Sequence, residues 1–115
     1  MLNANRAIEA YRSATRLRSP RDQEAEVFHQ TISVLRGARA AGPIQQVRAL
    51  ADNRRLWTTI IDLMRDPSNA LPDSLRAAIV SVGITVQREM DQEEPNFDFL
   101  IAINEHMAAG LSGQP

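Results

Sequence analysis

Residues 43–65 have the sequence PIQQVRALADNRRLWTTIIDLMR and predict the helix around which the rest of the chain folds. Proline suits the first position of a helix, and no later glycine or proline interrupts this stretch. Its apolar side chains recur at spacings of three and four, the pattern of an amphipathic helix. The predicted buried stripe contains Val47, Leu50, Trp57, Ile60, Ile61 and Met64, widened by Leu56 and Leu63.

Two asparagines fall in register with apolar stripes. Asn53 aligns with Leu56 and Ile60, and Asn104 aligns with Leu100 in a later apolar segment. A buried amide without a partner costs about 1–3 kcal/mol, so each asparagine should have a hydrogen-bond partner. One interpretation is structural: the two side chains bond backbone carbonyls or each other and fix helix register. The other is a polar contact to a bound peptide.

Two helices are predicted before residue 43. The first spans about residues 4–14, with Ile8 and Tyr11 as its apolar contacts. SPRDQEAEVF at 19–28 starts the second, because Ser19 can cap it, Pro20 fits its first position and acidic residues fill its first turn. This helix should end near residue 41, where Gly42 is expected to take the left-handed conformation. Its predicted apolar stripe is Ala25, Phe28, Ile32 and Leu35.

A turn and two further helices are predicted after residue 65. DPSNALPD at 66–73 consists of residues that favour turns, and Pro72 or Asp73 then opens a helix to about residue 91. Gly83 inside it weakens the helix by about 1 kcal/mol relative to alanine, which suggests close approach of a neighbouring helix. EEPN at 93–96 breaks the chain again before a last helix from about Phe97 to residue 109, ended by Gly110. The predicted apolar contacts are Leu75, Ile79, Val82 and Val86 in the first of these helices and Phe97, Leu100, Ile101 and Met107 in the second.

The expected fold is therefore an all-α bundle of four main amphipathic helices plus a short N-terminal helix. The length of 115 residues fits one domain with one modest core. We expect residues 1–18 to form a mobile arginine-rich segment and residues 110–115 a loose tail.

Composition restricts the possible functions. The chain has no cysteine, which excludes disulfides, thiol catalysis and cysteine-bound metal centres. No apolar run approaches the roughly 18 residues that cross a membrane, and the N-terminus lacks the apolar region of a secretory signal. We therefore expect a cytoplasmic protein with no membrane partner.

Charge is distributed unevenly along the chain. Residues 1–57 contain ten arginines and five carboxylates, a net charge of +5, whereas residues 58–115 contain three and nine, a net of −6. All thirteen basic residues are arginine, which reflects either a GC-rich genome or a preference for carboxylate or phosphate partners. Arg16, Arg18 and Arg21 are candidate contacts for RNA or another anion. The acidic total argues against DNA binding.

No arrangement of residues indicates an enzyme, a metal site or a cofactor. Glu26 and His29 have the Glu-x-x-His spacing of di-iron bundles, but the second such pair that those sites need is missing. His106 directly follows Glu105, and adjacent helix positions point in different directions. There is no nucleophile elbow and no phosphate-binding glycine loop. We expect a non-enzymatic protein.

Several short elements, in order along almost the whole chain, resemble the FlaF family, flagellar biosynthesis regulators of alphaproteobacteria. Tyr11 precedes SPRDQE, and DNRRLW supplies an N-x-x-L-W element. An N-x-L-P turn at 69–72 is followed by LRAAIVSVG. Ile103, Asn104, Gly110 and Leu111 fit the closing I-N…G-L pattern.

This resemblance implies a non-enzymatic helical protein needed for flagellin production and export. It implies flagellin as a partner, bound as by an export chaperone, and a second partner in FlbT, the regulator of flagellin messenger RNA translation. An alternative is an RNA-associated regulator of flagellin expression that acts through the basic N-terminal segment or with a partner. The candidate partner-binding residues are Asn53, Arg54, Trp57 and Asn104.

Overall fold

The computed structural model of the protein describes residues 20–111, with side chains from residue 24 onward. Four helices and no strand occur in this range: α2 (Pro20–Arg39), α3 (Pro43–Arg65), α4 (Asp73–Met90) and α5 (Phe97–Leu111). The all-α prediction is confirmed for these residues. The predictions of a helix at 4–14, of a mobile segment at 1–18 and of a loose tail beyond residue 111 concern residues outside this range.

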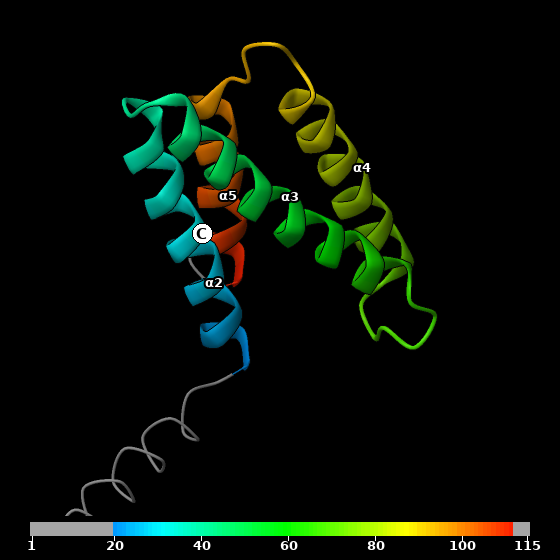
Figure 1. Cartoon of the computed structure of the whole chain (residues 1–115). Coiled ribbons are helices and arrows are strands. Elements are labelled where there is room, and N and C mark those ends of the chain that lie inside the picture. The colour runs from blue at the N-terminus through cyan, green and yellow to red at the C-terminus, as the bar shows by residue number, and fades with distance from the viewer. Residues whose placement is uncertain (1–19, 112–115) are drawn as a thin grey trace, which may run out of the picture.

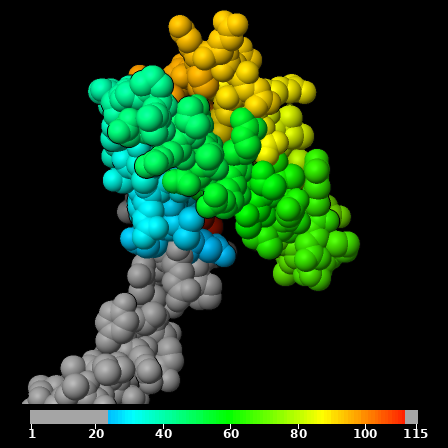
Figure 2. Space-filling model, in the orientation of Figure 1, coloured from blue at the N-terminus to red at the C-terminus, as the bar shows by residue number. Residues whose placement is uncertain are grey.

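The helices form two antiparallel pairs that meet at one end of the molecule. α2 packs against α5, α3 packs against α4, and the N-terminal half of α3 joins the pairs by packing on α2. From this junction the pairs diverge, so that α2 and α5 form one limb and α4 with the C-terminal half of α3 forms the other (Figure 1). The space-filling view shows the two limbs separated below the junction (Figure 2).

The core is concentrated where the two pairs meet. Trp57, Leu35 and Leu100 are fully buried there, and the ring of Phe28 packs edge-on against Trp57 with 6.2 Å between ring centroids. On α3 the buried positions recur every four residues, at Ala49, Asn53, Trp57 and Ile61. On α4 the buried residues are Gly83, Val86 and Met90, all in its second half.

The predicted stripe on α3 was wrong at two positions. Val47 is 66% exposed, because it precedes the buried Ala49 by two residues and therefore lies about 200° around the helix from it. Leu63 is 53% exposed for the same reason, because it follows the buried Ile61 by two residues and therefore lies about 200° around the helix from it. On α4, Leu75 is likewise exposed rather than part of a buried face.

The predicted Gly42 cap was also wrong. α2 ends at Arg39, and Gly42 has φ −74° and ψ 172°, which is extended backbone at the N-cap of α3. The physical reason is Pro43, whose ring disfavours helical conformations in the residue before it. At the other end of the chain, α5 continues through Gly110 to Leu111 instead of stopping before the glycine.

Gly83 has the close neighbour that its position predicted. A Cβ atom at Gly83 would lie 2.8 Å from Ile61 Cγ1 and 3.2 Å from Trp57 Cε3. Only a glycine lets α4 approach α3 this closely without displacing those side chains. The glycine therefore fixes the spacing of the α3–α4 pair.

Side-chain hydrogen bonds build the turn between α3 and α4. Asn69 Nδ2 donates to the Leu63 carbonyl at 2.9 Å, while Asn69 Oδ1 accepts from the Leu71 backbone N–H at 2.9 Å. Arg76 Nη1 donates to the carbonyls of Met64 at 3.1 Å and Asp66 at 3.3 Å. The last carbonyls of α3 are thereby satisfied, and the hairpin is closed at its tip.

Candidate partner-binding site

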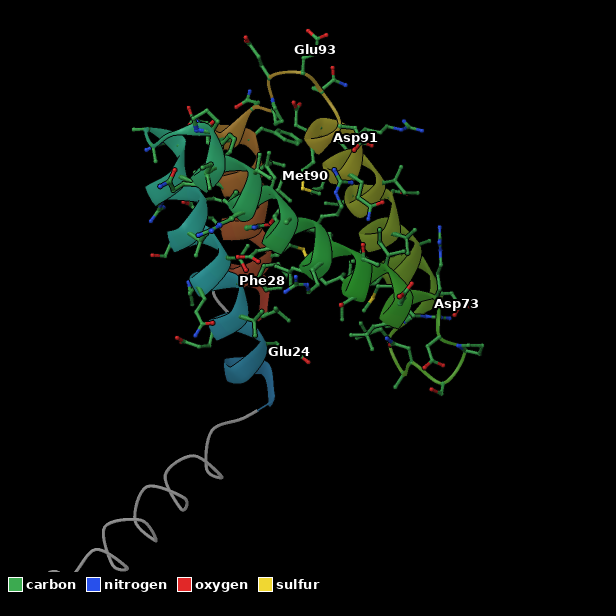
Figure 3. The ribbon with its side chains drawn as sticks, viewed as in Figure 1. Glu24, Phe28, Asp73, Met90, Asp91 and Glu93 are labelled. Atoms are coloured by element: carbon green, nitrogen blue, oxygen red, sulfur yellow. The ribbon has the colours of Figure 1, made fainter. Side chains whose placement is uncertain are left out.

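A chain of hydrogen bonds between buried side chains joins α3, α4 and α5. Trp57 Nε1 donates to Asn104 Oδ1 at 2.9 Å, and Asn104 Nδ2 donates to Asn53 Oδ1 at 2.8 Å. Asn53 Nδ2 in turn donates to the sulfur of Met90 at 3.3 Å. Met90 lies between the upper ends of α3 and α4 (Figure 3). Each donor therefore has an acceptor on another helix, and the arrangement fixes the relative register of three helices.

Three of the predicted partner-binding residues come together in this chain. Asn53, Trp57 and Asn104 are all fully buried, so none of them presents a surface to a partner in this conformation. The structural interpretation of the two asparagines, a hydrogen bond to each other, is the one observed. Their predicted role toward a partner requires movement of the helices around them and stays a prediction.

Arg54, the fourth predicted residue, lies at the surface. Its Nη2 forms an ion pair with Asp91 Oδ1 at 2.8 Å, linking α3 to the end of α4. Its side chain is still 44% exposed, so Arg54 is accessible to a partner near the junction of the pairs.

The predicted anion-binding residues fall outside the description. Arg16 and Arg18 precede residue 20, and the side chain of Arg21 is not described although α2 has already begun there. Glu26 and His29 are both exposed on α2, and His106 is exposed on α5. Among the described residues, no group of three or more metal-ligating side chains lies together, and no helix there is long and apolar enough to cross a membrane.

Two further ion pairs hold the α2–α5 limb together. Arg36 pairs with Glu105, and Arg39 pairs with Asp98. All four side chains are about half exposed or more, so these pairs orient the helices and contribute little stability each.

The α3–α4 limb, in contrast, has an apolar face that no helix of the described chain covers fully. Leu63 is 53% and Leu75 45% exposed, and Ile60, Ile79 and Val82 are half-buried. On α3 the face consists of Ile60 and, three residues later, Leu63, which lies about 200° around the helix from the buried Ile61. On α4 it follows the i, i+4, i+7 spacing of one helical stripe. We call these five residues the open apolar face. It lies on the half of the limb away from the junction (Figure 1).

A row of half-buried apolar side chains also lies on α5, in the other limb. Ile103, Met107 and Leu111 recur every four residues beside Asn104 and are all half-buried. Sequence reasoning placed Leu75, Ile79 and Val82 in the core and did not recognise a surface there. The apolar spacing was visible in the sequence, but the divergence of the limbs that exposes it was not.

A concave feature lies between α2 and α3, near the junction. It is an open pocket of about 330 Å³. One wall is the exposed Val34 of α2, and its rim carries one cation and one carboxylate of α3. The lining residues are Val34, Gly37, Ala38, Gln45, Arg48 and Asp52. It is much less apolar at its rim than the open apolar face.

Comparison with protein families identifies the group to which the chain belongs. A family model described as flagellar protein FlaF matches residues 7–111. The chain belongs to the FlaF family. No curated protein and no solved structure matches it significantly. The sequence resemblance is therefore confirmed, and the FlaF match spans all four described helices.

The short sequence elements that this chain shares with the FlaF family each have a structural role here. The N-x-x-L-W element contributes Asn53 and Trp57 to the buried network, and the I-N element contributes Asn104. The N-x-L-P element forms the hydrogen-bonded turn at the tip of the hairpin. In this FlaF-family chain the three elements thus hold the helices in register.

Proposed function

We propose that this protein is a non-enzymatic, cytoplasmic flagellin-binding export chaperone that promotes flagellin synthesis and secretion. Membership of the FlaF family supports a flagellar role. The observation that carries the chaperone proposal is the open apolar face, on which Leu63 of α3 and Leu75 of α4 are exposed beside half-buried isoleucine and valine side chains. An amphipathic helix binds such a surface by placing its own apolar residues at i, i+3, i+4 and i+7 along it.

The proposed mechanism is protection of an assembly surface. An unpolymerised flagellin exposes apolar helical segments that would otherwise associate prematurely. Docking one such segment along the open apolar face removes apolar surface of both molecules from water. No residue of the face is charged, so the partner helix is held by burial.

The test is co-elution of the purified chain with flagellin monomer on size exclusion at tens of micromolar. Leu63→Ser with Leu75→Ser should abolish the complex while leaving the helical content and thermal midpoint nearly unchanged, because both side chains are already about half exposed. Ile44→Ser with Val47→Ser is the matched control, since both residues are apolar, 66% exposed and outside the face. Failure of the wild-type chain to bind, or equal loss in the control, would contradict the proposal.

The RNA-associated alternative depends on different residues. It requires cations that contact phosphate, namely Arg16, Arg18 and Arg21, and such binding weakens steeply with salt. Neutralising these three arginines would abolish that binding and leave the flagellin complex intact. The open apolar face has neither the cations nor the exposed aromatic rings that RNA recognition uses, so it favours the chaperone.

A further inference from the structure

The outer side of α3, opposite its buried face, carries exposed apolar side chains. Ile44 and Val47 are each 66% exposed, more than any other large apolar side chain in the described part of the chain. Ala51 is also exposed and lies on the same side, about 200° around the helix from the buried Asn53. In Figure 1, α3 passes in front of α5, and no described helix lies over this side of α3. Ile60 of the open apolar face lies about 180° around the helix from Ala51, so the two surfaces are separate.

Arginines border these apolar residues on both sides. Arg54 lies about 60° around the helix from Ala51 in one direction. In the other direction, Arg48 lies about 60° and Arg55 about 40° from Ala51. All three arginines are exposed. We call this surface the arginine-bordered strip, and it consists of Ile44, Val47, Arg48, Ala51, Arg54 and Arg55. Along the helix axis it covers about three turns, or about 16 Å, which is enough for a short helix of another protein to lie on it.

The charge of two of these arginines is not neutralised within the described part of the chain. Arg54 pairs with Asp91, but Arg48 and Arg55 form no ion pair with any described residue. Asp52, between them in sequence, lies further around the helix toward α2, where it lines the pocket. The first turn of α3 contains no acidic residue, and no side chain caps its N-terminus, so the partial positive charge of the helix end is not offset either. The strip therefore favours a partner with negative charge.

We propose that the arginine-bordered strip binds an acidic amphipathic helix of a second protein. The apolar residues of that helix, at i, i+3 and i+7, pack on Ile44, Val47 and Ala51. Aspartate or glutamate on the borders of its apolar stripe faces the arginines, whose planar guanidinium groups can bond both oxygens of a carboxylate. The proposal does not rest on the chaperone function, because it uses none of the residues of the open apolar face.

A pair of synthetic peptides tests this proposal. Each peptide is a stapled helix of about 15 residues with leucine at i, i+3 and i+7, because a short helix is marginally stable in water without such a constraint. One peptide carries glutamate on both borders of the leucine stripe, and the control peptide carries lysine at the same positions. Fluorescence anisotropy with the full chain should show the glutamate peptide binding at least about tenfold more tightly than the lysine peptide, because its charges are opposite to those of the arginines.

Variants of the strip assign the binding to its residues. Ile44→Ser with Val47→Ser should weaken binding of the glutamate peptide about tenfold or more, since it removes both exposed apolar anchors. Arg48→Glu with Arg55→Glu should reverse the preference, so that the lysine peptide binds more tightly than the glutamate peptide. All four side chains are exposed, so the helical content measured by circular dichroism should not change.

Equal affinity of the wild-type chain for the two peptides would overturn the proposal. So would loss of glutamate-peptide binding in Leu63→Ser with Leu75→Ser, because it would place the peptide on the open apolar face. A uridine oligonucleotide that displaces the peptide from the wild-type chain and does not bind Arg48→Glu with Arg55→Glu would also overturn it, because it would assign the arginines to phosphate. The flagellin test depends on the open apolar face alone, so either proposal can fail without the other.

Discussion

The side-chain amide of Asn104 on α5 donates a hydrogen bond to Asn53 Oδ1 on α3 at 2.8 Å. The two residues are 51 positions apart in sequence, and both are fully buried. The bond lies in the middle of a run from the Trp57 indole to the Met90 sulfur. Because of this bond, the packing of α5 against α3 depends on a hydrogen-bonded pair of amides as well as on apolar contacts. Predictions about stability therefore begin with this pair.

Asn104→Leu should lower the free energy of unfolding by about 3 kcal/mol, because it leaves the Trp57 N–H and the Asn53 carbonyl buried without partners. Asn53→Leu should lower the free energy of unfolding by less, because the side-chain N–H group of Asn53 donates only to a sulfur atom, which is a weak acceptor. The double variant should lose less stability than the sum of the two single losses. Urea denaturation gives all three values, with Gln30→Leu at an exposed site of α2 as the control. Strict additivity would show that the pair is not coupled.

The two interior glycines should respond oppositely to alanine. Gly37→Ala should raise the free energy of unfolding by about 0.5–1 kcal/mol, because no atom lies within 4 Å of the new Cβ and alanine favours the helix. Gly83→Ala should lower it by about 1 kcal/mol or more, because overpacking against Ile61 outweighs the same helical gain. Ile61→Val in the Gly83→Ala background should recover part of the loss. Thermal unfolding monitored by circular dichroism measures each change, and stabilisation by Gly83→Ala would contradict the close contact.

Asp66 makes the turn at the hairpin tip sensitive to pH. The Ser68 backbone N–H donates to Asp66 Oδ1 at 2.9 Å and the Ser68 hydroxyl at 2.8 Å. These bonds, together with the nearby Arg76 cation, hold the pKa of the Asp66 carboxyl below its usual value. Because the folded pKa is lowered, the stabilisation is present above the unfolded pKa and is lost as pH falls through the folded pKa.

Ser68→Ala should therefore raise the pKa of Asp66 part of the way toward its ordinary value, since the backbone bond is the larger cause and remains. Carbon-detected nuclear magnetic resonance of the carboxylate during an acid titration measures the change. Ser74→Ala, at an exposed serine of α4, should leave the titration of Asp66 unchanged. A Ser68→Ala titration identical to that of the wild type would exclude the hydroxyl as a cause.

Substitution of Arg54 can distinguish a structural role of this residue from a role in partner binding. Arg54→Gln should lower the free energy of unfolding by at most about 1 kcal/mol, because its ion pair with Asp91 is largely exposed and screened by salt. If Arg54 also contacts flagellin, the same variant should weaken the complex, whereas Asp91→Asn should not. Isothermal titration of both variants with flagellin distinguishes the two cases, and unchanged affinity in both would assign Arg54 to the ion pair alone.

Much of the fold was predictable from local patterns. Pro20 and Pro43 mark the starts of α2 and α3, and the turn residues at 66–72 separate α3 from α4. The asparagines were identified as buried because they share a stripe with Leu56 and Leu100. A close neighbour was predicted at Gly83 because a glycine inside a helix has a known energetic cost, and the structure confirms that prediction.

The candidate site was less predictable because it depends on how the helices diverge. An apolar residue at helical spacing has the same pattern in sequence whether another helix covers it or not, so Leu63 and Leu75 were assigned to the core. Trp57 and Asn104 were considered for partner contact, yet their mutual hydrogen bond places both inside. The choice among these roles is made by contacts between residues about fifty positions apart.

The sequence by itself determined the helices, their ends within a few residues and the family, because these depend on spacing, capping and turn chemistry that act over a few residues. The tertiary structure alone decided that Asn53, Asn104, Trp57 and Met90 join in one hydrogen-bonded chain. It also decided that the α3–α4 pair extends away from α5. Because burial is a property of the whole packed chain, only that divergence turned part of an apolar stripe into the open apolar face.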